Sequence, residues 1–479
     1  MAITKVTWPM VDQTSTSDSS NNTFLGNTAL DSLTTGGANT AVGASAGTAL
    51  TTGSQNTSIG KSALETMVAG NNNTAVGFAA LRYANDANAI QNTCVGSLTG
   101  GAITTGNNNT AVGHNTLFTL QTGNLNSAFG QGALAYNVSG SYNAGFGYHS
   151  LLNFTGSNGC AFGVESLTAL TTGINNTAFG YGALKSVVTS ASNTAVGYLA
   201  GQVITSAQNT CMGDSALYAT TTGAANTAYG YNALVANQTG AHNTAIGAQA
   251  LISNVSGSRN VSLGRVTLIS ATGDDNTAIG TTALNACTTG TVNTALGGQA
   301  LNTLTTYSNC TGLGFNAQVT GSNQVQLGDS STTTYAYGAV QNRSDNRDKA
   351  DVRPTTLGLD FINSLRPVDF KWDLREDYFV EEEVDSGLVD EQGAPIMVTR
   401  RTRVEKDGSK KRNRFHHGLI AQEVKAACDA AGVDFGGYQD HSLKGGENVL
   451  SLGYEELIAP LIKAVQQLST EVAALKASA

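Results

Sequence analysis

The sequence predicts a mostly β protein, in which a parallel β-solenoid of about 19 short coils precedes a small α+β domain that ends in a coiled-coil helix. Three observations lead to this fold class. A short unit recurs along the first two thirds of the chain, proline is absent between residues 10 and 353, and charge becomes frequent only after residue 340. The predicted parts are an N-terminal segment (1–21), a repeat shaft (22–330), a tip or linker (331–343) and a C-terminal domain (344–479).

The repeat has the form N-T-A-V-G-x-x-A-L followed by a polar turn, as in NTAVGFAAL (73–81) and NTAFGYGAL (176–184). Counting on the glycine gives 19 copies, and most steps have the same length as the step from Gly26 to Gly43. Such a unit is too short for a helix pair or a propeller blade, but it suits one coil of a solenoid. The absence of proline agrees, because a ladder of stacked strands needs nearly every backbone N–H.

Each column of the repeat has a physical interpretation. The residue before the glycine is apolar in all 19 copies, the residue two before it is nearly always small, and asparagine usually lies four before it. Because strand side chains alternate between two faces, the apolar residue and the threonine share one face, and the small residue and the asparagine share the other. We expect the asparagines to bond from coil to coil and the Ala-Leu pair to form a second short strand. Neither face looks fully solvated, and a slender stack gains by trimerising.

The C-terminal domain has its own elements. Residues 357–372 read as an amphipathic helix broken at Pro367 and then a short strand, and 418–432 read as a helix with a glycine stop. Residues 380–384 and 398–414 read as exposed, oppositely charged strands or as an arm, with a turn at 407–408. Near the end, apolar residues alternate spacings of four and three, which predicts a coiled coil whose first turn is broken or kinked at Pro460. The seam consists of Tyr454, Ile458, Leu461, Val465, Leu468, Val472 and Leu475.

Composition excludes several classes of function. The net charge of −9 argues against a general nucleic-acid binder. No stretch approaches 18 apolar residues and the N-terminus lacks a secretory signal, so membrane insertion is not expected. The six cysteines have no metal-like spacing, which favours buried thiols in a reducing compartment over intermolecular disulfides. We expect neither a metal nor another cofactor.

Two resemblances refine this picture. The N-T-A-V-G units resemble the head repeats of trimeric bacterial adhesins, which are left-handed parallel β-rolls packed as trimers, and such repeats also occur in phage tail fibres. Four blocks, at 344–349 (SDNRDK), 357–372, 418–424 (GLIAQEV) and 454–468, resemble the C-terminal intramolecular chaperone of phage tail fibres and tailspikes, the peptidase S74 family of endosialidases. The resemblance implies a homotrimeric virion fibre made in the host cytoplasm. Its N-terminus would join a tail or baseplate protein, and the fibre would contact a host surface receptor, such as a glycan.

In that family the C-terminal domain folds and trimerises the fibre and then cuts itself off before the serine of S-D-x-R-x-K. Carried onto this chain, the resemblance implies cleavage between Arg343 and Ser344, with Ser344 as nucleophile, Lys349 as base, and Asp345 and Arg347 in support. A serine can attack the preceding carbonyl to give an ester that water opens, provided that a lysine of lowered pKa takes its proton. This would be single-turnover self-cleavage with no external substrate. The alternative is that SDNRDK is an ordinary helix start with serine as N-cap.

Other functions remain as alternatives. A cell-surface trimeric adhesin would share the repeats, but it needs a secretion signal and a membrane anchor. A glycan-degrading tailspike usually needs paired carboxylates, and only ten acidic residues are spread over the first 340 positions. An ice-binding solenoid is disfavoured because the threonines share their face with bulky apolar residues. His416 and His417 could touch the chemistry or simply end a strand, and the role of Glu423 is open.

Overall fold

The computed structural model describes residues 21–329, 331–334, 347, 349–389, 395–444 and 449–478. All but Asn21 of the predicted N-terminal segment, and most of the predicted tip or linker at 331–343, lie outside the described residues. The chain groups into two compact units, residues 1–260 and 261–479.

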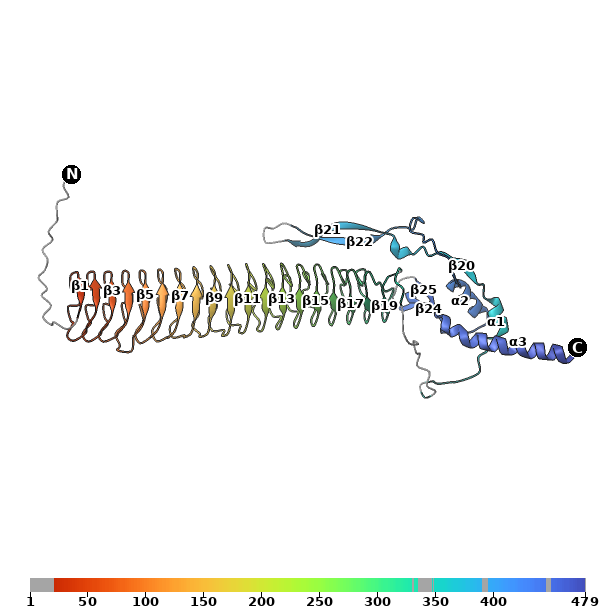
Figure 1. Cartoon of the computed structure of the whole chain (residues 1–479), viewed down its shortest axis with the longest axis horizontal. Coiled ribbons are helices and arrows are strands. Elements are labelled where there is room, and N and C mark those ends of the chain that lie inside the picture. The colour runs from red at the N-terminus through yellow and green to blue at the C-terminus, as the bar shows by residue number, and fades with distance from the viewer. Residues whose placement is uncertain are drawn as a thin grey trace. The chain divides into compact units, whose positions relative to one another are not determined.

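The repeats form the predicted β-solenoid (Figure 1). Each repeat gives one three-residue strand, and 19 strands make one parallel sheet in which partners occupy the same repeat position. The strands of the first unit are β1 (Thr23–Leu25), β2 (Thr40–Val42), β3 (Thr57–Ile59), β4 (Thr74–Val76), β5 (Thr93–Val95), β6 (Thr110–Val112), β7 (Ser127–Phe129), β8 (Ala144–Phe146), β9 (Cys160–Phe162), β10 (Thr177–Phe179), β11 (Thr194–Val196), β12 (Thr210–Met212), β13 (Thr227–Tyr229) and β14 (Thr244–Ile246). Those of the second unit are β15 (Val261–Leu263), β16 (Thr277–Ile279), β17 (Thr294–Leu296), β18 (Thr311–Leu313) and β19 (Val325–Leu327).

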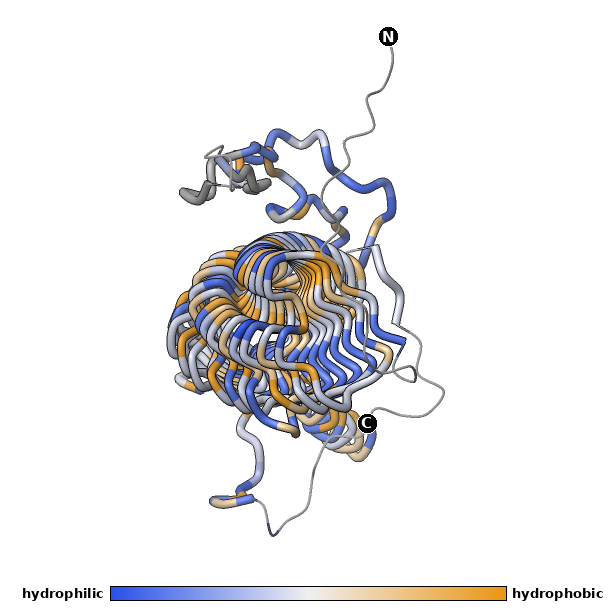
Figure 2. Tube along the Cα trace, turned by 90° about the vertical axis from the view of Figure 1, so that its left-hand side faces the viewer, coloured by the Kyte–Doolittle hydropathy of each residue, from blue (hydrophilic) through white to orange (hydrophobic). Residues whose placement is uncertain are grey.

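The two strand faces are as predicted. The central small residue points into the coil and is buried, as Ala178 shows, whereas the flanking Thr177 and Phe179 face outward. The outward apolar residues form a column whose rings stack from coil to coil, with centroids 4.7 Å apart for Phe129 and Phe146 and 4.5 Å apart for Phe146 and Phe162. Figure 2 shows the hydrophobic positions aligned along successive coils.

The asparagine ladder is also confirmed. Asn126 is fully buried, and its Oδ1 accepts the backbone N–H of Asn143 in the next coil at 3.0 Å. Its Nδ2 donates to the Oδ1 of Asn109 at 3.0 Å and to the carbonyl of Gly140 at 2.9 Å. Each amide therefore bridges neighbouring coils, which keeps the buried backbone groups paired.

Replacing Asn126 with alanine is expected to lower the free energy of unfolding by about 2–4 kcal/mol, because the buried N–H of Asn143 and the carbonyl of Gly140 lose their partner. Urea unfolding followed by circular dichroism measures the loss. Asn85→Ala is the matched control, since Asn85 is exposed. Equal stability of the two variants would contradict a stabilising role for the ladder.

The ladder is interrupted at Gly159 and Cys310, which replace asparagine. At the first break, the ring of Phe154 fills the space, and a Cβ on Gly159 would lie 2.7 Å from that ring. The backbone N–H of Gly159 still donates to the Oδ1 of Asn143 at 2.8 Å. A larger core side chain has thus replaced one rung without breaking the stack.

The glycine that ends each strand is required by the close approach of the coils. Gly163 has a φ of +139°, and a Cβ there would lie 2.2 Å from the carbonyl oxygen of Gly180 in the next coil. Any larger residue would strain the backbone and push the two coils apart.

The second strand predicted at the Ala-Leu pair is wrong. This part of the coil is a turn, in which Leu64 has a φ of +53° and a buried side chain. Its N–H donates to the carbonyl of Ala80 in the next coil at 3.0 Å, whereas the N–H of Ser62, with a φ of +59°, donates to the carbonyl of Ala44 in the previous coil at 2.9 Å. The left-handed residues thus turn alternate N–H groups toward opposite neighbours, so coil-to-coil bonding continues beyond the strand.

All six cysteines are free thiols. Five of them are buried, as predicted, and Cys160 is half-buried. Burial raises the pKa of Cys94 and of Cys211 to about 12, so these thiols stay protonated near neutral pH.

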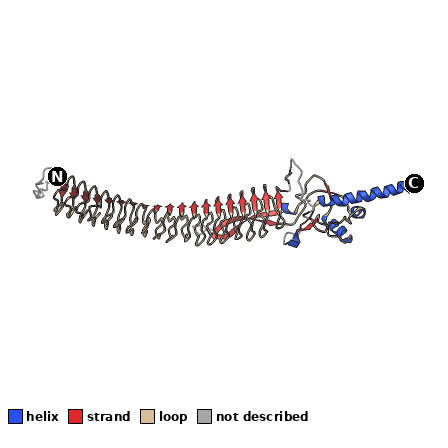
Figure 3. Cartoon of the chain, turned by 90° about the horizontal axis from the view of Figure 1, so that it is seen from below, coloured by secondary structure: helices blue, strands red, loops and turns tan. Residues whose placement is uncertain are grey.

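The second unit continues with the C-terminal domain, where the described helices occur (Figure 3). Its elements are α1 (Leu359–Ser364), β20 (Val368–Phe370), η2 (Arg375–Asp377), β21 (Phe379–Val389), β22 (Pro395–Arg403), β23 (His416–Gly418), α2 (Ala421–Ala430), β24 (Tyr438–Asp440), η3 (His441–Lys444), β25 (Leu450–Leu452), η4 (Tyr454–Leu457) and α3 (Ile458–Ser478). Strands β20 and β23, β21 and β22, and β24 and β25 form three antiparallel pairs. No described helix is both long and apolar enough to cross a membrane.

Most local predictions for this domain are confirmed. Helix α1 ends before Pro367 and a short strand follows, and α2 stops at Gly432, whose φ is +63°. The charged strands pair as a hairpin in which Glu381 lies opposite Arg401. Helix α3 is continuous, because Pro460 lies in its first turn, where the missing N–H has no partner within the helix. The interruption falls earlier, at the 3₁₀ turn η4.

Candidate functional site

The predicted cleavage site follows the solenoid in the sequence and marks the start of the C-terminal domain. Arg343, Ser344 and Asp345 lie outside the described residues, while Arg347 and Lys349 are described and exposed. The serine–lysine dyad therefore stays a prediction.

The domain is built on a small apolar core between α1, α2 and η4. Phe361, Val424, Cys428, Phe435 and Leu457 are its buried members. They come from segments that are far apart in the sequence, so this core holds those segments together. Burying one such side chain contributes about 1.5–3 kcal/mol.

Helix α1 depends on α3 for its N-terminal cap. No side chain of its own caps α1, and instead the backbone N–H of Leu359 donates to the Oε1 of Gln467 at 2.7 Å. A Cβ on Gly358 would lie 2.1 Å from the same oxygen, so a larger residue there would displace the Gln467 side chain from its capping position. The first helix after the predicted cut is thus tied directly to the predicted coiled-coil helix.

Glu423 has a structural role that sequence reasoning left open. Its carboxylate holds Arg366 with both oxygens, including an Nε–Oε2 hydrogen bond of 3.1 Å. The hydrogen bonds and charge of the pair raise the pKa of Arg366 and lower that of Glu423. The pair links α2 to the loop after α1, and its partial exposure makes it an orienting contact more than a source of stability.

The two histidines lie on β23, opposite β20. His417 Nδ1 is 2.5 Å from Asp369 Oδ1 in an exposed cross-strand pair. The ring of His416 stacks at 6.0 Å from that of Phe370, which meets Trp372 edge-on at 4.9 Å. Both side chains therefore contact residues of the paired strand β20, as the strand-end interpretation expects.

Polar contacts anchor the base of the β21–β22 hairpin. The buried Tyr378 donates its hydroxyl proton to Asp373 Oδ1 at 2.7 Å and accepts the backbone N–H of Lys410 at 2.9 Å. Lys406 Nζ lies 3.0 Å from the other oxygen of Asp373. The Tyr378 hydrogen bond, and then Lys406, hold the pKa of Asp373 below its ordinary value. These contacts tie the segment before β21 to the segment after β22.

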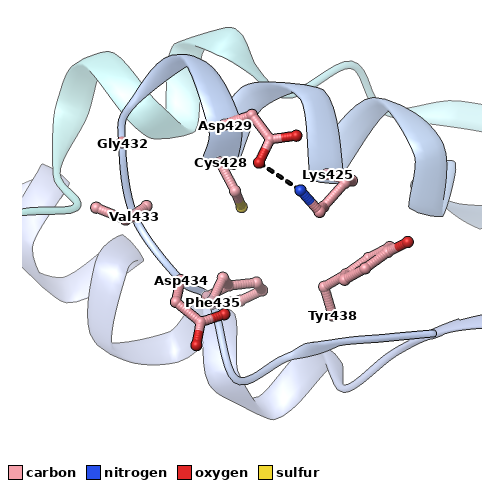
Figure 4. A pocket seen from close by; sticks show the side chains of 8 residues that line it. All are labelled: Lys425, Cys428, Asp429, Gly432, Val433, Asp434, Phe435 and Tyr438. Atoms are coloured by element: carbon pink, nitrogen blue, oxygen red, sulfur yellow. Dashed lines mark hydrogen bonds and ion pairs between the residues drawn. The ribbon is translucent and has the colours of Figure 1, made fainter. Parts of the chain in front are cut away.

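A pocket of about 230 Å³ lies between α2 and β24 (Figure 4). Lys425 is paired with Asp429 on its rim, and its ammonium lies 6.0 Å from the ring of Tyr438. The thiol of the pocket, Cys428, is buried, and burial raises its pKa. The pocket therefore offers no activated nucleophile, and the described residues contain no group of metal-ligating side chains.

The predicted seam on α3 is an apolar face left bare in the single chain. Six of its residues are between 41 and 68 % exposed: Ile458, Leu461, Val465, Leu468, Val472 and Leu475. Part of this face is hollowed into a groove of about 410 Å³. Tyr454 departs from the predicted seam, because it lies on η4 and its hydroxyl oxygen accepts the N–H of Leu419 at 2.9 Å.

Residues 344–392 match the family model described as the chaperone of endosialidase. We call these residues the endosialidase-chaperone segment. It begins at the predicted nucleophile and includes α1, β20, η2 and β21. The comparison with curated proteins and the comparison with solved structures each give no match.

The endosialidase-chaperone segment, placed after a β-solenoid, fits a tailspike or fibre with a C-terminal chaperone. The match does not extend to residues 418–424 and 454–468, where the similarity rests on the sequence blocks alone. Sequence reasoning missed the cap by Gln467 and the ion pair of Arg366. Neither contact has a local signal, since the partners are 108 and 57 positions apart.

Proposed function

We propose that this chain is a homotrimeric phage tail fibre that binds a host surface receptor. Its C-terminal domain would drive trimer folding and then release itself by cutting between Arg343 and Ser344. The observation that carries the proposal is the endosialidase-chaperone segment, placed directly after a β-solenoid and before a helix with a bare heptad face. The protein would reside in the virion after synthesis in the host cytoplasm.

Two unpartnered apolar surfaces support a trimer. One is the heptad face of α3, and the other is the outward column of the solenoid, in which Phe179 is 55 % exposed and Tyr229 is 54 % exposed. Monomeric proteins rarely leave long apolar patches in water. Three copies around a common axis would cover both surfaces with equivalent contacts.

Self-cleavage would follow assembly in this proposal. Ser344 Oγ would attack the carbonyl carbon of Arg343 and lose its proton to Lys349, and the amine of Ser344 would leave as an ester forms. Water would then open the ester and free the two products. Asp345 and Arg347 of the same motif would support this step. Cleavage would leave a kinetically trapped fibre that cannot readily unfold and refold.

The remaining partners follow from the resemblance to phage fibres. Residues 1–21 would attach the fibre to a tail or baseplate protein, and the solenoid or its tip at 331–343 would contact the receptor, such as a glycan. A glycan-degrading activity is not proposed, because the described solenoid has few carboxylates.

The mass of the assembled protein tests the proposal. For uncleaved complexes, native mass spectrometry is expected to give three times the chain mass of 49.1 kDa. Dissociation in acid and denaturant should return single chains. A monomer or dimer at micromolar concentration would rule out the trimeric fibre.

A further inference from the structure

The asparagine ladder needs an ending at the last coil of the solenoid. Within the ladder, the side-chain amide donates to a backbone carbonyl of the following coil, as Asn293 Nδ2 does to Tyr307 O at 2.9 Å. Gln324 holds the last ladder position, just before β19, and the described part of the chain beyond β19 contains no further coil. The amide donor of Gln324 therefore has no next-coil carbonyl to meet.

His441 of the C-terminal domain supplies the missing acceptor. The Gln324 Nε2 atom is hydrogen-bonded to His441 Nδ1, and Thr320 Oγ1 lies 3.0 Å from the same nitrogen. The Oε1 of Gln324 accepts the backbone N–H of Thr320 at 2.8 Å, which fixes the orientation of the amide. Because that amide presents its N–H₂ to the ring, Nδ1 is the acceptor of this hydrogen bond.

The far side of the ring is held by the β24–β25 pair. His441 Nε2 lies 3.0 Å from Ser451 Oγ, so its N–H donates to that hydroxyl. The backbone N–H of His441 donates to the carbonyl of Val449 at 3.1 Å. Strand pairing thus places the imidazole at a fixed position.

The last coil has surface that needs protection. Among the described strands, β19 pairs with β18 alone, and its two apolar side chains are bare, with Val325 71 % exposed and Leu327 48 % exposed. An open end of a stacked sheet is an edge on which other chains can add. Repeat proteins therefore need a dedicated cap at each end.

We propose that His441 caps the asparagine ladder, and that through it the C-terminal domain recognises the finished last coil of its own solenoid. The imidazole presents an acceptor nitrogen where a further coil would present a carbonyl oxygen. The inference rests on the proposed role of the domain in folding the fibre. It names the contact through which the domain would act on the solenoid. A domain docked in this way covers the open edge of the last coil. It thereby lowers the free-energy barrier to stacking the neighbouring coils on that coil.

Hydrogen exchange of the full-length chain tests the cap. In His441→Ala, exchange of the Thr311 and Gly328 amides, which bond within the last two coils, is expected to be at least about tenfold faster than in the wild type. Amides of β2 and β3 should not change. His441→Gln keeps an acceptor oxygen and should retain most of the protection, and His114→Ala, at an exposed histidine far from the last coil, is the control. Unchanged exchange in His441→Ala would overturn the proposal.

A double-mutant cycle separates the contact from a general loss of folding. Gln324→Met removes the donor, so its effect on exchange should not add to that of His441→Ala. Additive effects would overturn the cap, as would equal losses in His441→Gln and His441→Ala. The mass of the same samples reports separately on the proposed trimer. If the protein is a monomer but exchange is faster in His441→Ala, the trimer is refuted and the cap is supported. If the protein is a trimer and exchange is unchanged in His441→Ala, the cap is refuted and the trimer is supported.

Discussion

Replacing Ser344 with alanine is expected to abolish self-cleavage and to leave every chain at its full length of 479 residues. The wild-type protein should instead yield, after assembly, one fragment that ends at Arg343 and one that begins at Ser344. Without the hydroxyl no ester can form, so cleavage should slow by at least about 10³-fold. Denaturing gels and intact mass spectrometry of freshly folded protein measure both products.

Two further variants separate the parts of the reaction. Lys349→Arg keeps the positive charge but cannot act as a base near neutral pH, so it should be as inactive as Ser344→Ala. Ser409→Ala changes an exposed serine of the same domain and should cleave normally. Persistent cleavage at residue 344 in Ser344→Ala would exclude the proposed nucleophile. Rapid cleavage in Lys349→Arg would exclude only the proposed base.

Placing aspartates at Val465 and Leu468 is expected to prevent trimer formation. Both side chains lie on the bare heptad face of α3, and a trimer would bury six carboxylates in one apolar seam. Burying an unpaired charge costs several kcal/mol even after relaxation. This cost far exceeds the free energy gained by burying the remaining apolar side chains at the same level of the coiled coil. The dissociation constant should rise by at least about 10³-fold, as measured by sedimentation equilibrium.

The matched control for this variant is Gln466→Asp. Gln466 is exposed on the same helix, between the two seam positions in sequence but outside the heptad pattern, so its aspartate should leave the trimer intact. If cleavage depends on assembly, the seam variant should also remain uncleaved while the control is cut. A stable trimer in the seam variant would show that α3 does not hold the chains together.

The solenoid could be predicted because the same side chains recur at the same positions in each coil. The buried Ala178 and Asn126 followed from the alternation of a strand, and their partners followed from the period of the repeat. The path between strands could not be predicted in this way. Leucine rarely adopts positive φ in isolation, but here that conformation lets the N–H of Leu64 bond to the carbonyl of Ala80 in the next coil.

The candidate site was predictable only as a motif. The sequence places Ser344 and Lys349 close together along the chain, but their geometry depends on contacts from distant segments. Gln467 caps α1 from 108 positions away, and His441 meets Gln324 across 117 positions. Single contacts of this kind do not recur along the sequence, so neither a repeat nor a periodic pattern can predict them.

The constant strand register has a consequence for how such a protein can change. Coils that are shorter or longer than the usual repeat still pair equivalent positions, as Ala144 with Cys160 and Thr74 with Thr93 do. In the longer coil a turn around Asp86 holds the extra residues, with Asn88 N–H bonded to Asp86 Oδ1 at 2.9 Å. Unequal recombination between repeated coding units could therefore remove or add whole coils. Each coil would change the length of the solenoid by about 4.8 Å, while the coils at both ends stay the same.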